Sequence, residues 1–355
     1  MWDDFEGGRI LQKLLKLQQK LVPDLLKIIQ KRYQILKSIQ LTGPIGRRPL
    51  AHMLDMTERV LRSEVDFLKE RQLISARPAG MEITDDGMVL LKELAELVRG
   101  ITGIHELEEQ LNRLLGIAEV KIIPGDSDDT PVVKEELGQA CADQLKKILK
   151  AQNIIAVTGG TTMACAAEMM TREIGKGKQI LFVPARGGVG DDVKNQANSI
   201  CAKMAEQTGG SHRALYIPDQ VSEKVRESLL QDPNISEVLN LIQSANIVLH
   251  GIGDAIKMAT RRNTNDADMD KLLKEQAVGE AFGYYFNIEG EVVHKVSTVG
   301  LQLADLHRAR HAVAVAGGKS KAKAIQSYMK SAPPNTVFIT DEGAAKELFK
   351  ALTNI

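Results

Sequence analysis

Apolar residues near the start of the chain recur at helical spacing, and turn residues separate them. One amphipathic helix is predicted from Asp24 to Gln40, followed by the helix-ending turn Thr42-Gly43-Pro44. A short second helix comes next, and Thr57 is placed to cap the N-terminus of a third. The segment 74–83 has the pattern of two short strands. Helices joined by a tight turn and followed by a strand pair predict a winged helix-turn-helix over residues 23–86.

A heptad-like pattern covers the predicted helical connector, residues 87–116. Gly100, Gly103 and Glu108 interrupt the pattern. Two interpretations therefore stay open, a helix packed on the C-terminal domain and a helix that pairs with a second copy of the chain. Residues 1–22 are assigned to an N-terminal extension. The apolar seam consists of Leu94, Leu97, Ile101, Ile104, Leu111 and Leu115.

The remainder of the chain, residues 117–355, alternates short β-rich runs with helical patterns. Most runs are followed by a Gly, Ser or Thr turn and then a helix. Such alternation predicts an α/β domain with an open, mainly parallel sheet, whose ligands bind at the C-terminal ends of the strands. The predicted strands are Val120–Ile123, Ile154–Val157, Ile180–Val183, Ala214–Ile217, Ile247–Leu249, Ala312–Ala316 and Val337–Ile339.

Charge is divided unevenly along a chain whose formal net charge is zero. Between Arg9 and Gly80 there are 15 Lys and Arg against 6 Asp and Glu, a net charge of +9, whereas Met81 to Ile355 carries −6. A basic N-terminal module on an acidic body is typical of a protein that binds double-stranded DNA. The alternatives are a solvated basic surface and a winged helix that contacts proteins. DNA sites with twofold symmetry favour a homo-oligomer, at least a dimer.

Several polar residues of the predicted winged helix are candidates for DNA contact. Arg59 and Arg62, three residues apart on the third helix, could reach guanine edges. Thr57 and Ser63 suit phosphate or mixed contacts. The Arg47-Arg48 pair fits anchoring to the DNA backbone. The complete set of predicted DNA-binding residues is Arg47, Arg48, Thr57, Glu58, Arg59, Arg62, Ser63, Lys69 and Arg77, the last at the tip of the wing.

Three glycine-rich turns in the C-terminal domain have the character of anion-binding loops. The turn TGGTT contains Gly160, Thr161 and Thr162 and runs into a helix, so backbone amides, hydroxyls and the helix dipole could meet at one anion. The turn ARGG supplies Arg186, which suits a bidentate phosphate contact. The turn AGGKSK contains Gly317, Gly318 and Lys321. None is a Walker loop or a GxGxxG fingerprint. Together they predict a phosphorylated ligand rather than structural turns alone.

Other polar residues could complete this ligand site. Gln196 follows the Arg186 turn, and the Arg261-Arg262 pair follows the turn His250-Gly251-Ile252-Gly253. Glu280 would suit the hydroxyl groups of a sugar. A solvated arginine pair and a surface helix cap are the alternative interpretations of Arg261-Arg262 and Glu280.

Other features limit the function classes. The scattered Cys141, Cys165 and Cys201 indicate a reducing cytoplasm and no zinc site, and we expect no metal and no cofactor. No apolar stretch approaches the ~18 residues of a membrane span. The segment Asp341-Glu342-Gly343 could be taken for the carboxylate base of a sugar-phosphate isomerase or deaminase, the enzyme alternative. Its other interpretation is a helix N-terminus capped by Asp341, which we favour together with a non-enzymatic function.

Long runs of the sequence resemble the SorC/DeoR-type sugar-responsive transcriptional repressors, and among them the regulators of glycolytic operons. The resemblance extends from about Leu21 to near the C-terminus. It is carried by GPIGRRPLAHMLDMTERVLRSEVDFLKE, VTGGTT, FVPARGGVGDDVKNQANSICAKMAE, AFGYYFNIEGEVVHKV, VAVAGGKSKA and TDEGAAK.

The resemblance implies a repressor induced by fructose 1,6-bisphosphate that forms a tetramer on a bipartite operator. It also implies a sugar-phosphate isomerase-like, Rossmann-type C-terminal effector domain. Lys319 stands where a small residue is more usual. The effector-binding residues carried over by motif are Gly160, Thr161, Thr162, Arg186, Gln196, Arg261, Glu280 and Lys321.

Overall fold

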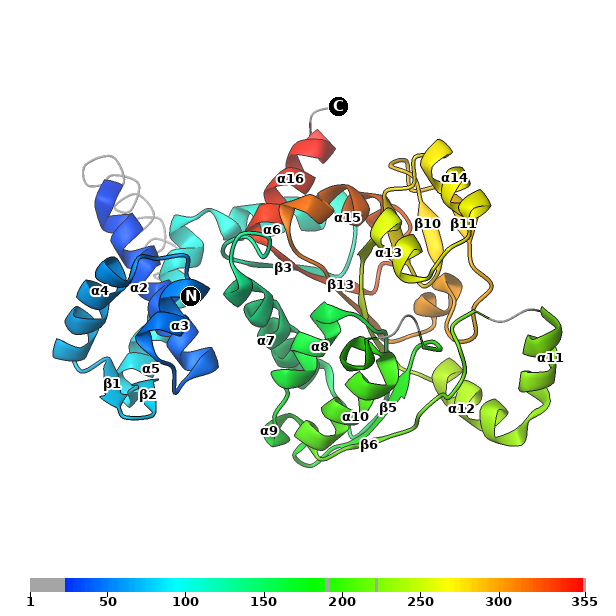
Figure 1. Ribbon diagram of the computed structural model, residues 1–355, viewed down its shortest axis with the longest axis horizontal. Coiled ribbons are helices and arrows are strands. Elements are labelled where there is room, and N and C mark those ends of the chain that lie inside the picture. The colour runs from blue at the N-terminus through cyan, green and yellow to red at the C-terminus, as the bar shows by residue number, and fades with distance from the viewer. Residues whose placement is uncertain (1–22, 189–191, 221–222, 354–355) are drawn as a thin grey trace, which may run out of the picture. The chain divides into compact units, whose positions relative to one another are not determined.

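The computed structural model describes residues 23–188, 192–220 and 223–353 and divides into two compact units (Figure 1). The N-terminal unit runs up to Leu107 and also includes Thr130–Val132, and the C-terminal unit begins at Glu108. The division thus falls inside the predicted connector. The predicted N-terminal extension, residues 1–22, lies outside the described residues.

The N-terminal unit is the predicted winged helix. Leu36, Leu50 and Leu61, one from each of the first three helices, have no exposed surface. The hydroxyl of Thr57 accepts a hydrogen bond from the Val60 amide, as its predicted role as helix cap requires. The wing is a two-stranded antiparallel sheet. The elements are α2 (Pro23–Thr42), α3 (Arg47–Met53), α4 (Glu58–Glu70), β1 (Ile74–Arg77), β2 (Gly80–Ile83) and α5 (Asp85–Ile101).

The predicted connector forms two helices, α5 and α6 (Ile104–Leu115). They are separated at Gly103, whose φ of +70° ends helical geometry at low cost only for glycine. Leu91 and Val98 of α5 are buried in the core of the winged helix. Glu108 of α6, the charged residue within the apolar seam, accepts a hydrogen bond of 2.7 Å from the Ile122 amide. This contact gives a structural reason for a carboxylate at that position.

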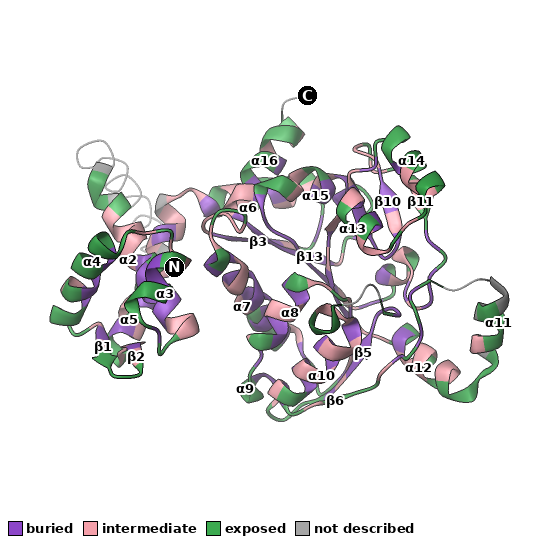
Figure 2. Cartoon of the chain, viewed as in Figure 1, coloured by how far each residue is buried: buried purple, intermediate pink, exposed green. Residues whose placement is uncertain are grey.

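The C-terminal unit is built on a seven-stranded parallel sheet with the order β3-β13-β12-β7-β4-β5-β6. Its central strands are buried on both faces, which is typical of parallel sheets covered by helices (Figure 2). Side chains of α7, α8 and α10 pack with alternate strand residues in one large core. The sheet strands are β3 (Glu119–Ile123), β4 (Gln152–Val157), β5 (Gln179–Pro184), β6 (Ser211–His212), β7 (Ile247–Gly251), β12 (His311–Val315) and β13 (Thr336–Asp341).

The helices and short 3-10 turns of this unit connect the strands of the sheet. The α-helices are α7 (Pro131–Ile148), α8 (Thr161–Glu168), α9 (Arg172–Gly175), α10 (Ala197–Thr208), α11 (Glu223–Gln231), α12 (Pro233–Gln243), α13 (Ala255–Arg261), α14 (Asp266–Lys274), α15 (Ala322–Met329) and α16 (Glu342–Thr353). The 3-10 helices are η1 (Val193–Asn195), η2 (Leu303–His307) and η3 (Lys319–Lys321). Within the described ranges, no helix is both long and apolar enough to span a membrane.

One strand prediction is wrong, and one sheet was not predicted. The predicted strand Ala214–Ile217 is wrong, because the strand of that region is the two-residue β6. Leu215 is buried, but both oxygen and nitrogen of its backbone bond to the Asn198 side chain instead of a neighbouring strand. The sequence also missed a four-stranded antiparallel sheet of β8 (Gly253–Asp254), β9 (Gly279–Ala281), β10 (Tyr284–Phe286) and β11 (Val292–Lys295). These strands are too short for a period of two to be visible.

Candidate functional site

The predicted DNA-contacting residues share one property, which is that all nine are exposed. Leu61, Val65 and Leu68 turn inward from α4 and leave its polar face to solvent. Arg59 and Arg62 project from the N-terminal half of this helix, and neither has an ion-pair partner among the described residues. The arrangement matches a recognition helix whose N-terminal side chains reach base edges.

Arg48 and Arg77, which lie outside the recognition helix, each form an ion pair with a nearby glutamate. Arg48 Nε lies 2.9 Å from Glu58 Oε1. The carboxylate of Glu58, itself a predicted DNA-binding residue, therefore holds the Arg48 side chain in place. Arg77 Nη1 lies 3.4 Å from Glu82 Oε2 on the paired strand. Both pairs are largely exposed, so DNA phosphates could compete for these guanidinium groups.

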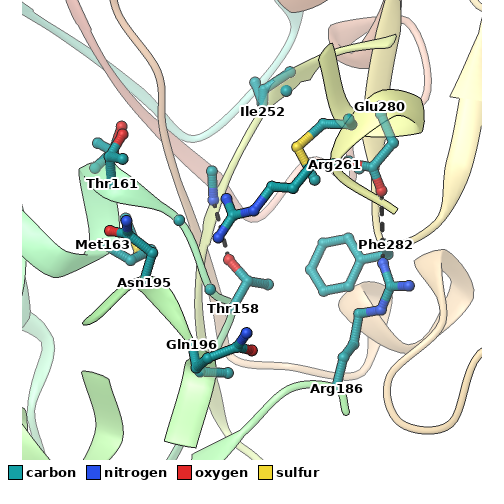
Figure 3. Close-up of a pocket in the computed structure, with 18 of the residues that line it drawn as sticks. Thr158, Thr161, Met163, Arg186, Asn195, Gln196, Ile252, Arg261, Glu280 and Phe282 are labelled. Carbon is teal, nitrogen blue, oxygen red and sulfur yellow. Dashed lines mark hydrogen bonds and ion pairs between the residues drawn. The ribbon is translucent and has the colours of Figure 1, made fainter. Parts of the chain in front are cut away.

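The second candidate site is a cavity at the C-terminal ends of β4, β5, β7 and β12, where parallel sheets place their ligands (Figure 3). The cavity brings together eight of the ten predicted effector-binding residues from segments far apart in the sequence. They are Gly160, Thr161, Thr162, Arg186, Gln196, Arg261, Glu280 and Lys321.

The first turn, after β4, presents the N-terminus of α8 to the cavity. Gly160 occupies the N-cap position with a φ of +123°, and no side chain caps the helix there. Thr161 and Thr162, the first two helical residues, both line the cavity. Uncapped amides at a helix N-terminus carry partial positive charge and donate to anions.

Two cations line the cavity without a carboxylate partner among the described residues. Lys321 is half-buried, and burial lowers the pKa of its ammonium below the usual range of lysine, with Lys134 and Lys257 adding to the shift. Arg261 extends into the cavity toward Thr158 (Figure 3). A bound anion would relieve the cost of holding these charges together.

A buried network of two arginines and two acids forms one wall of the cavity. The Arg186 guanidinium binds Asp219 through two hydrogen bonds of 2.9 and 2.7 Å, and its Nη1 lies 3.6 Å from Glu280. Arg262 donates to Glu280 at 2.9 Å and to the Tyr285 hydroxyl at 3.0 Å. No charged side chain of the network is more than 7% exposed. Burial lowers the pKa of Arg262, but Glu280, Tyr285 and Asp219 together raise it by more, so the group stays protonated.

This network changes the interpretation of two predicted residues. Arg186 lies in the cavity wall, but its Nε and Nη2 donate to Asp219 and are not free for a ligand. Phosphate binding by Arg186 therefore stays a prediction. Glu280 Oε1 accepts from Arg262 and, at 2.6 Å, from the Gly283 amide. Its Oε2 has no hydrogen-bond partner among the described residues. That oxygen is therefore the one available to a ligand hydroxyl.

The third turn contributes less to the cavity than its sequence predicted. Lys321 lines the cavity, but Gly317 and Gly318 do not. The Gly318 amide donates to Asp341 Oδ2 at 2.6 Å and faces this carboxylate instead of the cavity. Asp341 itself has no exposed surface and caps α16 by accepting from the Ala344 amide at 2.9 Å. The cap interpretation of Asp341 is thus confirmed, and the geometry gives no support to its use as a base.

Sequence reasoning missed several residues of the site. Asp219 holds Arg186 and Arg262 from an irregular segment that follows Pro218, where no motif marks it. Thr158 lines the cavity one residue before the paired glycines, and its hydroxyl accepts from the Gly251 amide at 3.3 Å. Asn195 also lines the cavity. Thr158 begins the TGGTT turn and Asn195 precedes the predicted Gln196, so position along the chain was the available signal for these two residues, whereas Asp219 had none.

A winged helix in the same chain as an α/β domain with a cationic cavity defines a ligand-responsive transcriptional regulator. Comparisons with known proteins agree with that class. A sugar-binding domain family matches residues 99–350, and the CggR N-terminal DNA binding domain matches residues 28–98.

Three relatives show the family. The central glycolytic genes regulators of Priestia megaterium and Bacillus subtilis are 52% and 50% identical to this chain, over 96% of it and 99% of each relative. The crystal structure of a SorC family transcriptional regulator from Enterococcus faecalis is 48% identical, with a TM-score of 0.66 over 69% of this chain and 99% of that one. The chain belongs to the central glycolytic genes regulator family, among the SorC/DeoR-type sugar-binding regulators.

Proposed function

We propose that the chain represses a glycolytic operon by holding operator DNA and releases the DNA when fructose 1,6-bisphosphate enters the cavity. The observation that carries the proposal is the pair of cations, Lys321 and Arg261, that face the same cavity as the uncapped N-terminus of α8. The names of the relatives from Priestia megaterium and Bacillus subtilis support a glycolytic target. The symmetry of operators favours a homodimer as the working form, and the family resemblance adds a tetramer on DNA.

The cavity suggests how the sugar is held. One phosphate binds the α8 amides, the hydroxyls of Thr161 and Thr162, and the Lys321 ammonium, which are donors suited to a dianion. The second phosphate binds Arg261. Glu280 Oε2 accepts from a sugar hydroxyl. Effector binding shifts the equilibrium only by its differential affinity for the released and DNA-bound states.

We expect a bisphosphate to release DNA at a concentration at least about tenfold lower than a monophosphate, because a monophosphate leaves one cation unpaired. The measurement is a titration of the protein bound to a DNA fragment selected from a random pool, with fructose 1,6-bisphosphate and fructose 6-phosphate. Arg261→Ala should remove most of the difference. The exposed Arg172→Ala, outside the cavity, is the matched control. Equal responses of the wild type to both sugars would contradict the proposal.

For DNA, we expect Arg62→Ala to weaken binding by ~1–3 kcal/mol and to relax preference at one base pair, because Arg62 projects from the recognition helix toward a base edge. Arg48→Ala should weaken binding to all sequences and reduce the salt dependence, as loss of a phosphate contact does. Fluorescence anisotropy with the selected fragment and a scrambled one, at several salt concentrations, separates the two. If both variants bind DNA as the wild type does, the surface that carries Arg48 and Arg62 does not contact DNA.

The enzyme alternative, a sugar-phosphate isomerase or deaminase, requires a base beside the substrate carbon. Asp341, the carboxylate that suggested it, is buried behind the Gly318 loop. Sugar-phosphate turnover by the purified protein would revive that alternative.

A further inference from the structure

Three segments meet at the carboxylate of Asp341, the last residue of β13. Its Oδ2 accepts from the Gly318 amide at 2.6 Å and from the Ser127 amide at 2.9 Å. Its Oδ1 accepts from the Ala344 amide at 2.9 Å. One buried carboxylate therefore ties the loop that leads to Lys321 to both the β3–α7 loop and the start of α16.

The β3–α7 loop adds two more carboxylates to the same loop. Asp126 Oδ1 accepts from the Lys319 amide at 3.3 Å, and Asp128 Oδ2 accepts from the Ser320 amide at 2.7 Å. Three successive amides, those of residues 318 to 320, thus donate to three aspartates. Successive amides of a glycine-rich loop often form a nest for phosphate. Here protein carboxylates occupy that nest, and Lys321 is the first residue of the loop that lines the cavity.

The glycines of this loop fit the aspartates rather than a ligand. A Cβ at Gly317 would collide with Asp341 Oδ2, and one at Gly318 would lie 2.5 Å from Asp128 Oδ1. Gly318 also has a φ of +96°, which disfavours other residues. The carboxylates approach the loop backbone so closely that only glycine is tolerated.

We propose that Asp341, supported by Asp126 and Asp128, is a positioning residue that fixes the loop so that Lys321 extends into the effector cavity. The three aspartates are not among the residues that line the cavity, so they act on the anion only through the loop. Anion binding at this end of the cavity then depends on the side chain of Lys321 and not on the amides of the loop. The inference rests on the proposed function for the identity of the ligand alone.

The test is the affinity for fructose 1,6-bisphosphate, measured by calorimetry on the full chain. Asn keeps the shape of Asp341 but weakens its hydrogen bonds to the Gly318 and Ser127 amides. We expect Asp341→Asn to raise the Kd about tenfold, the scale of one lost charged hydrogen bond. In a Lys321→Met background the same substitution should change the Kd by less than about twofold, because the positioned group is absent. Asp305→Asn is the matched control, since Asp305 also accepts from a backbone amide, that of Gln302, away from the cavity.

Each outcome decides. An unchanged Kd for Asp341→Asn, or an equal loss with and without Lys321, would overturn the proposal. If Asp341→Asn fails to fold, the exposed Asp128→Asn replaces it, with a smaller increase of the Kd that again depends on Lys321.

A readout without sugar separates this inference from the proposed function. The rate of Lys321 acetylation by acetic anhydride, followed by mass spectrometry across pH, reports the state of its amine. Loss of the nearby Asp341 charge moves that profile to lower pH even if the loop keeps its place, so the informative quantity is the limiting rate at high pH, where the amine is neutral and the rate reports its accessibility. Asp341→Asn should change this limiting rate, whereas Asp305→Asn should leave it unchanged. A changed limiting rate in a protein that ignores fructose 1,6-bisphosphate would contradict the choice of ligand and keep the positioning role. An unchanged limiting rate would contradict the positioning role itself.

Discussion

We expect Lys321→Met to bind fructose 1,6-bisphosphate about 10- to 100-fold more weakly than the wild type, because the substitution removes a charged hydrogen bond of ~1.5–3 kcal/mol. The substitution keeps the length of the side chain and removes its charge. Since burial opposes that charge, the variant should also unfold at a slightly higher temperature without ligand. Calorimetry and thermal unfolding measure the two effects. An unchanged Kd would show that Lys321 does not bind the anion.

The pH dependence gives a second check on the same group. The free protein holds the pKa of Lys321 below that of an ordinary lysine, chiefly by burial. A bound phosphate favours the charged amine and raises that pKa, so binding takes up a proton at pH values near the free-state pKa. Affinity should therefore fall as the pH rises through this pKa toward the ordinary value of lysine. Lys321→Met should lack that fall.

Arg262→Met should destabilise the C-terminal unit by roughly 3–5 kcal/mol, because it leaves Asp219 and Glu280 with a single guanidinium between them in a buried site. For a domain of this size, the unfolding temperature should fall on the order of 10 °C. Thermal unfolding followed by circular dichroism measures the shift. The control is Arg308→Met, which breaks an exposed ion pair with Asp305 and should cost at most ~1 kcal/mol.

Charge balance can be tested within the same network. Adding Glu280→Gln to Arg262→Met restores neutrality, since Arg186 and Asp219 remain paired. Gln keeps an oxygen that can accept from the Gly283 amide. The double variant should therefore be more stable than Arg262→Met alone. Additive losses in the two variants would show that the four charges do not act as one unit.

The parts of the fold that were predictable are those with a strong apolar period. Helix α4 and the buried strands of the parallel sheet follow from such periods. The antiparallel sheet of β8 to β11 was missed because its strands have two to four residues, too few for a period to show. Leu215 and Ile217 were mistaken for a strand because buried residues are apolar whether their backbone groups bond to a neighbouring strand or, as for Leu215, to a side chain.

The candidate site divides in a similar way. Lys321 and the Thr161-Thr162 pair could be predicted because glycine-rich turns after strands converge at one edge of a parallel sheet. The pairing of Arg186 with Asp219 could not, because the two residues are 33 positions apart and no local pattern links them. For the same reason Gly317 and Gly318 were assigned to the ligand. Their amides could equally meet carboxylates brought by β13 and the β3–α7 loop.

The hydrogen bond between Glu108 and the Ile122 amide has a consequence for how the chain behaves at high concentration. Strand β3 forms one margin of the parallel sheet. A free amide on an edge strand can pair with a strand from another molecule and so favours aggregation. The Glu108 carboxylate occupies this amide and brings a negative charge to the margin. The opposite edge strand, β6, has only two residues that could pair with another strand. Both edges of the sheet are therefore unsuited to pairing with the sheet of another copy, and any assembly of copies should use other surfaces.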